Sequence, residues 1–192
     1  MAESTKKLTW DLMILQEMAA QMGDYLNSEA LFWPLGHREM PMLTLGGFWL
    51  RQHRLNSLQT LLTKDQQTEL SEATDLYETA VADWVVRVEQ RANTELETRI
   101  RQWHEYLRDV RAGNSADIAA YPTQVENRAI MAALVNALQE RPYLLDDALA
   151  AKISLQDKGL RARWQSGPFV WPEEWQPAYP EPEFWWLYGR PK

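Results

Sequence analysis

Two short stretches between residues 33 and 54 hold the side chains best suited to chemistry. The first reads Trp33-Pro34-Leu35-Gly36-His37, and the second contains Trp49 and His53. Trp49 and His53 are four residues apart, so they share a face if this stretch is helical. Imidazole titrates near neutral pH and can act as a base. We therefore expect Trp33, His37, Trp49 and His53 to be the candidate ligand-binding residues, with aromatic walls and two titratable rings.

The competing interpretation is that both tryptophans belong to the core and both histidines are polar residues above it. Catalytic roles need convergent geometry, which spacing alone does not supply, so this second interpretation is favoured. The third histidine, His104, is remote in sequence, and none of the three lies in a His-Glu-x-x-His motif. The chain has no cysteine, glycine-rich phosphate loop or Gly-x-Ser-x-Gly motif. We accordingly predict no catalytic residue, no metal site and no cofactor.

Charge and composition limit the classes of partner that this chain is expected to bind. The net charge is −7, and residues 65–122 carry twelve acidic but only six basic side chains. Without a strongly basic block, nucleic acid is not an expected partner. The longest apolar run, residues 129–135, is far shorter than the roughly 20 residues of a membrane span. The lack of cysteine and of a signal-peptide pattern favours a cytoplasmic protein that does not enter a membrane.

The elements that must position the candidate residues are helical. Leucine, alanine and methionine recur at steps of three and four between residues 8 and 26, which predicts an amphipathic helix. A second helix is expected over about residues 44–62, although Gly46-Gly47 weakens its first turn. The residues between these helices form an irregular and unusually apolar segment.

A longer apolar stripe begins after the capping box Thr63-Lys64-Asp65-Gln66 and continues to Val110. Its mean step is close to that of a straight α-helix, so it predicts a long central helix over about residues 65–112. Unbroken, this helix would be longer than a compact chain of this size is wide. It therefore either protrudes and associates with a partner or breaks, and Thr94, which begins a second capping box, is the natural breakpoint. The apolar stripe keeps its phase across Thr94, however, which favours a continuous helix.

Two further helix starts are expected. Thr123-Gln124-Val125-Glu126 is a third capping box, and the helix after it is rich in alanine. Pro142 is suited to the first turn of a last helix that continues to about residue 164.

The composition changes after Ser166. Residues 167–192 hold six prolines and eight aromatic residues, a mixture that opposes both helix and disorder. We expect an extended strap packed along the helices, because each buried aromatic ring removes roughly 150–250 Å² from water. The alternative is a groove that binds a partner. Its candidate partner-binding residues are Trp171, Trp175, Trp185 and Trp186.

The sequence thus predicts an all-α bundle of about five helices, with a long central helix and an extended C-terminal strap rich in proline and aromatic residues. The expected division is a helical domain over residues 1–166 and a tail over residues 167–192. The expected function is a helical interaction or scaffold module that forms homo-oligomers, or a homodimer, or binds another protein. The alternative is an enzyme or small-ligand-binding protein that uses the region of residues 33–54.

Overall fold

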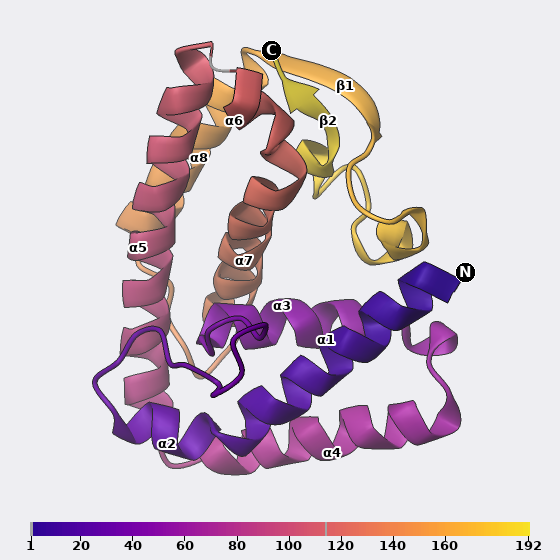
Figure 1. Ribbon diagram of the computed structural model, residues 1–192. Coiled ribbons are helices and arrows are strands. Elements are labelled where there is room, and N and C mark those ends of the chain that lie inside the picture. Colours follow the sequence, from indigo (N-terminus) through magenta and orange to yellow (C-terminus); the bar gives the residue numbers. More distant parts are fainter. Residues whose placement is uncertain (1, 114) are drawn as a thin grey trace.

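A computed structural model describes residues 2–113 and 115–192, most of which are helical (Figure 1). The elements before the long central segment are α1 (Ala2–Ala20), α2 (Met22–Asn27), α3 (Leu45–Ser57) and the short 3-10 helix η1 (Gln59–Leu61). They are followed by α4 (Lys64–Val81), α5 (Val85–Arg111), α6 (Ser115–Ala119), α7 (Tyr121–Gln139) and α8 (Asp147–Arg161). The predicted all-α fold is confirmed.

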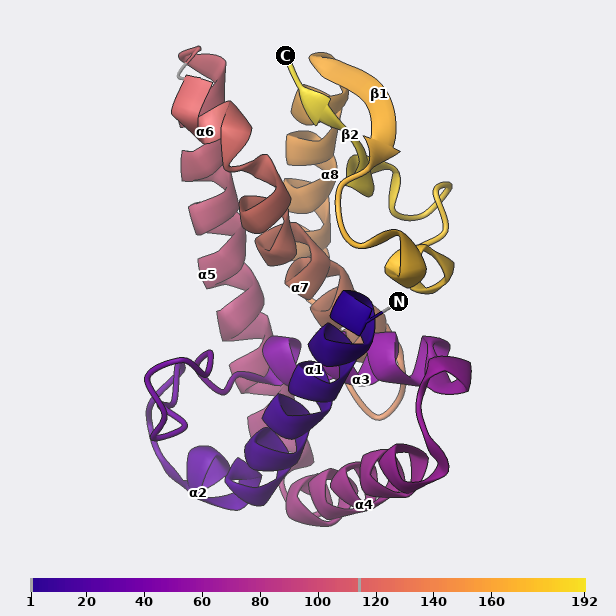
Figure 2. The same cartoon turned by 45° about the vertical axis from the view of Figure 1, so that its right-hand side comes forward.

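The helices form two groups. Helices α1 and α4 pack side by side across one end of the molecule, with α3 above them, whereas α5, α7 and α8 stand together at a steep angle to that layer (Figures 1 and 2). The predicted stripe of the first helix is buried, including Leu8, Leu12 and Leu15. Among the described residues, no helix combines the length and apolar character that crossing a membrane requires.

The predicted long helix is corrected by the structure. It is not continuous, and it does not break near Thr94, because α4 ends at Val81 and α5 begins at Val85. Helix α4 packs on α1, whereas α5 packs on α7 and α8, so a corner between them lets both halves of the stripe be covered by the same chain. Buried members occur on both sides of the corner, such as Tyr77 and Trp103.

One of the three predicted capping boxes caps a helix. The Thr63 hydroxyl accepts from the Gln66 N–H, and the Gln66 side chain accepts from the Thr63 N–H. Thr94 instead lies inside α5, where its hydroxyl donates to the carbonyl of Gln90 at 2.8 Å. Thr123 lies in the first turn of α7, which begins two residues earlier.

The last helix starts later than predicted. Pro142 follows a cis peptide bond and precedes α8 by several residues, and the helix is capped by Asp146, whose side chain accepts from the Ala148 N–H.

The C-terminal segment is the predicted strap, with more local structure than expected. Strands β1 (Trp164–Phe169) and β2 (Tyr188–Pro191) pair antiparallel, with an irregularity between Ser166 and Phe169. Between the strands lie two 3-10 helices, η2 (Glu173–Ala178) and η3 (Trp185–Leu187). The strap packs beside α3, α7 and α8, and no larger sheet occurs in the described part of the chain.

Candidate ligand-binding site

Helix α3 positions the two site residues that the structure brings together. Thr44 caps this helix by accepting from the Gly47 N–H at 3.0 Å. One and two turns later, Trp49 and His53 project from the same face, as their spacing predicts. Trp49 is buried, and its indole N–H donates to the Tyr77 hydroxyl at 2.9 Å. Burial raises the pKa of that tyrosine, so the hydroxyl stays protonated.

Trp49 and His53 line a cavity of about 190 Å³ between α3, α7 and the strap. On the α7 side the wall consists of Ala129, Ala133 and Ala137, which recur at every fourth residue. Their small side chains leave space where leucines would fill it. Tyr179 and Phe184 of the strap complete the cavity, and the polar groups at it include the amides of Gln52, Asn56 and Asn136.

His53 connects this cavity to the strap. Its Nε2 lies 2.9 Å from the carbonyl oxygen of Ala178. A carbonyl only accepts, so Nε2 must carry the hydrogen, and Nδ1 of the neutral ring is then a hydrogen-bond acceptor. The imidazole also packs against the rings of Tyr179 and Phe184, at centroid distances of 5.7 and 6.0 Å. The ring is therefore fixed in position and in tautomer.

A buried ionic cluster holds the strap against α3. Arg54 is 3% exposed, donates from Nε to the Tyr179 hydroxyl at 2.9 Å, and forms an ion pair with Asp11. Its guanidinium also lies 3.9 Å from the ring centroid of Trp175, a cation–π contact. Burial lowers the pKa of Arg54, but Tyr179 and Asp11 outweigh this effect, so that the net pKa is raised. The strap residues that close the cavity are therefore anchored before any ligand binds.

Arg51 completes this cluster from the preceding turn of α3. It lies 3.5 Å from Asp11 and donates to the carbonyl of Gly47. Burial lowers its pKa, an effect that Asp11 and Glu126 oppose.

The other two predicted site residues lie elsewhere. Trp33 is half-buried in the segment between α2 and α3, where it forms a β-bridge with Leu43 and donates its indole N–H to Gln21 at 2.8 Å. His37 is exposed in the same segment, and neither residue lines the cavity. Among the residues that the structure describes, no three His, Asp or Glu side chains are grouped to hold a metal ion.

The four strap tryptophans make contacts within the chain. Trp171 donates its indole N–H to the carbonyl of Pro122 at 2.9 Å, and Trp175 stacks on Arg54. Trp185 lies under Arg161, and Trp186 is 1% exposed beneath Arg128. These contacts are those of a strap, and a role in binding a partner stays a prediction.

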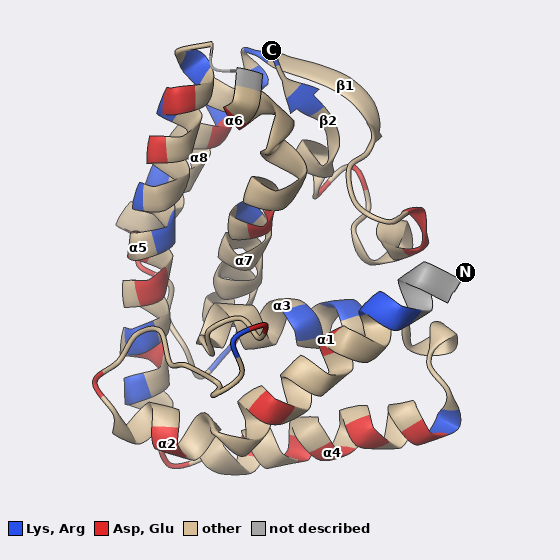
Figure 3. Cartoon of the chain, viewed as in Figure 1, with Lys and Arg blue, Asp and Glu red and all other residues tan. Residues whose placement is uncertain are grey.

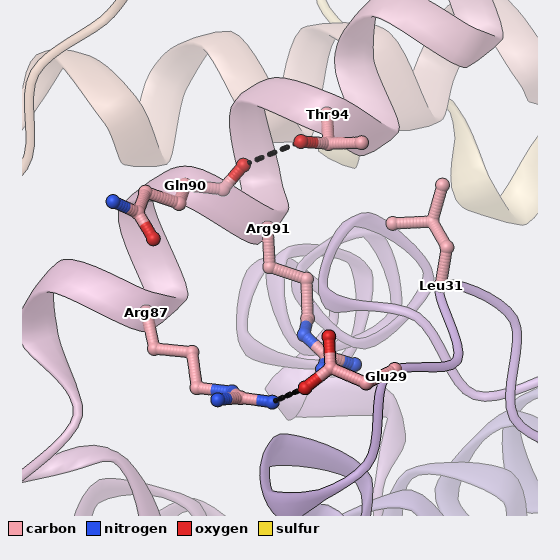
Figure 4. A pocket seen from close by; sticks show the side chains of 6 residues that line it. All are labelled: Glu29, Leu31, Arg87, Gln90, Arg91 and Thr94. Atoms are coloured by element: carbon pink, nitrogen blue, oxygen red, sulfur yellow. Dashed lines mark hydrogen bonds and ion pairs between the residues drawn. The ribbon is translucent and has the colours of Figure 1, made fainter.

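A second, more open hollow lies where α5 meets the segment after α2 (Figure 4). Arg87 and Arg91 point from α5 toward this segment. Both donate to the carbonyl of Ser28, Arg91 also donates to Ala30, and Arg87 pairs with Glu29. Because these guanidinium groups are occupied by the chain itself, we assign them to holding the segment in place.

The fold and the site define a helical protein with a small, partly open cavity bordered by its own C-terminal strap. Searches of protein-family models, of curated proteins and of solved structures found no significant match to this chain.

Sequence reasoning missed the residues that close the cavity. Tyr179 and Phe184 lie more than 120 residues after His53, and no local pattern relates them. The alanine-rich composition of α7 was visible in the sequence, but composition alone does not show that these alanines line a cavity.

Proposed function

We propose that the protein binds a small molecule in the cavity between α3, α7 and the strap. The observation that carries this proposal is the pairing of an alanine-lined wall with an imidazole that its Nε2 contact with the Ala178 carbonyl holds in place. Typical ligand pockets measure about 300–1,000 Å³, so this one suits a small ligand. A dry cavity of about 150 Å³ holds benzene, which makes a single-ring compound the appropriate size.

The ligand class follows from the wall chemistry. The alanines and aromatic rings favour an apolar ring, and Nδ1 of His53 favours a hydrogen-bond donor on it, such as a hydroxyl or an amide N–H. We propose binding and not catalysis, because the only other titratable side chain among the described lining residues is Tyr179. Burial raises the pKa of that hydroxyl, which already accepts from Arg54.

Phenol is a suitable probe, and toluene is the matched ring without a donor. For ligands of this size the expected dissociation constant lies between about 1 µM and 1 mM. Isothermal titration calorimetry should show saturable phenol binding that is stronger than toluene binding. Ala133→Leu fills the cavity and should weaken phenol binding at least tenfold. Ala132→Leu changes the neighbouring α7 residue, which does not line the cavity, and should leave binding unchanged.

Circular dichroism would show whether Ala133→Leu remains folded. Asn136→Phe provides a second filling variant from an exposed position at the cavity. The proposal is contradicted if phenol binding does not saturate, or if phenol binds both cavity-filling variants, Ala133→Leu and Asn136→Phe, with the wild-type affinity.

Self-association is the second candidate function, and charge separation supports it. The apolar stripe no longer argues for a partner, because α4 and α5 bury it within the chain. However, α4 and the turn after it carry mostly acidic side chains, whereas basic ones gather at the opposite end, around the ends of α5, α8 and β2 (Figure 3). Oppositely charged ends favour head-to-tail contact between copies.

Two charge-reversed proteins test this candidate. One carries Glu72→Lys with Asp75→Lys, and the other carries Arg163→Glu with Lys192→Glu; all four positions are exposed. Sedimentation at low salt should show association of the wild type, none in either variant alone, and renewed association when the two variants are mixed. A wild type that sediments as a monomer at every concentration would refute head-to-tail assembly.

A further inference from the structure

A larger cavity, of about 460 Å³, lies at the other end of the strap, between the β1–β2 ribbon and the start of α7. Ile118, Pro122 and Val170 supply apolar walls. Ser166 and Arg190 supply polar groups from the two strands. This volume falls within the usual range of pockets for drug-sized ligands.

Gly189 allows the two strands of the ribbon to approach closely beside this cavity. Gly189 has φ +138°, and a Cβ there would lie 2.2 Å from the carbonyl oxygen of Gln165. A Cβ on Gly167 would lie 3.5 Å from the Cα of Gly189. Both glycines line the cavity, so this part of its wall is backbone without side chains.

Two hydrogen bonds fix the cavity walls relative to each other. The Tyr121 hydroxyl donates to the carbonyl of Trp186 at 2.6 Å, and the indole N–H of Trp171 donates to the carbonyl of Pro122 at 2.9 Å. Both bonds join the start of α7 to the strap. The cavity is therefore formed without a ligand, which lowers the entropic cost of binding.

Arg190 is the only charged residue among the described residues that line the cavity, although the chain is acidic overall. Arg190 is exposed, and no carboxylate of the described residues lies within ion-pair distance of it. Basic residues gather at this end of the molecule, which appears blue near the C-terminus in Figure 3. Other cations of this end include Arg111 in the last turn of α5, Arg163, which donates to the Arg111 carbonyl, and Lys192, whose backbone N–H donates to the Arg163 carbonyl.

We propose that this cavity binds an amphipathic carboxylate whose apolar body lies between α7 and the ribbon and whose anionic group pairs with Arg190. A guanidinium binds a carboxylate through two parallel hydrogen bonds. It therefore binds a carboxylate more tightly than a neutral group of the same shape. The Ser166 hydroxyl offers a further donor at the same wall. This site is separate from the cavity beside His53 and does not depend on the function proposed for that cavity.

Naphthalene-2-carboxylate is the probe, and naphthalene-2-carboxamide is its neutral counterpart of the same shape. Calorimetry with the full chain should show the acid binding at least tenfold more tightly than the amide. Arg190→Gln should remove that preference by weakening the acid at least tenfold. Arg163→Gln removes a charge from the same end but not from the cavity, and it should change the affinity less than threefold.

Filling the cavity provides an independent variant. Ala119→Leu, at an exposed lining position, should weaken both the acid and the amide. Equal binding of acid and amide by the wild type would overturn the proposal. Equal losses in Arg190→Gln and Arg163→Gln would also overturn it, because they would indicate attraction to a basic surface only. Loss of naphthalene-2-carboxylate binding in Ala133→Leu would place the probe beside His53 and would likewise refute this site.

Discussion

The substitution Gly46→Ala adds a single methyl group to α3 and tests how closely this helix packs against α7. A Cβ at this position would lie 2.6 Å from Cγ2 of Ile130, 2.8 Å from Cγ of Leu134 and 2.9 Å from Oε1 of Glu95. Glu95 is fully buried, accepts from the Gly46 N–H at 2.9 Å, and pairs with Arg99. Relief of the clash would therefore disturb both a packed interface and a buried ion pair.

Gly23 is the matched control. It lies in α2, and a Cβ there would meet no atom within 4 Å. Gly23→Ala should stabilise the protein by about 0.5–1 kcal/mol, because alanine loses less backbone entropy in a helix. Gly46→Ala has the same helical gain, but overpacking a core costs about 1–3 kcal/mol and a disturbed buried pair adds to this cost.

The expected net result is that Gly46→Ala is at least about 2 kcal/mol less stable than Gly23→Ala, or about 4–8 °C in melting temperature. Urea unfolding followed by circular dichroism measures the free-energy difference directly. If Gly46→Ala is as stable as Gly23→Ala, the α3–α7 contact is looser than described, and the cavity walls are not fixed as argued.

Three further predictions concern the strap, its anchor and the buried tyrosines. Deletion of residues 167–192 removes the cover given by Trp175 and Trp186, so the melting temperature should fall by more than about 6 °C and dye binding should increase; an unchanged melting curve would contradict the strap. Arg54→Met leaves the buried carboxylate of Asp11 without the closer of its two arginine partners and should cost about 3–5 kcal/mol in urea unfolding, whereas a loss below about 1 kcal/mol would show that the cluster is not important for stability. Burial raises the pKa of Tyr25 to about 12, so stability should be fully present below pH 10 and decline as the pH rises further; absorbance at 295 nm that follows free tyrosine would refute this.

The sequence predicted the helical fold because helical periodicity and helix capping depend on residues that are close together in the sequence. The stripe of α1, the cap at Thr63 and the face shared by Trp49 and His53 all depend on residues a few positions apart. The corner between Val81 and Val85 was not predictable in this way. No glycine or proline marks it, and it forms because the two helices pack against different partners.

The candidate site was predictable only in part, for the same reason. The spacing of Trp49 and His53 is a property of one helix, and the structure places both at a cavity. Whether Trp33 and His37 reach the site depends on how the irregular segment between α2 and α3 folds. In the structure this segment places neither residue at the cavity. The strap residues reach the cavity through the Arg54 cluster, which depends on Asp11, Arg54 and Tyr179 meeting from distant parts of the chain. A cytoplasmic location and the two-domain division stay predictions.

The central claim is that the cavity beside His53 receives a small ligand, and nuclear magnetic resonance tests it most directly. In a titration of isotope-labelled protein with phenol, the indole N–H of Trp49 and the side-chain amides of Gln52 and Asn136 should shift together and saturate. The side-chain amide of Gln90, in the open hollow on α5, should not shift. Saturation of other signals while Trp49 and Gln52 stay unchanged, or no saturation at all, would contradict the account.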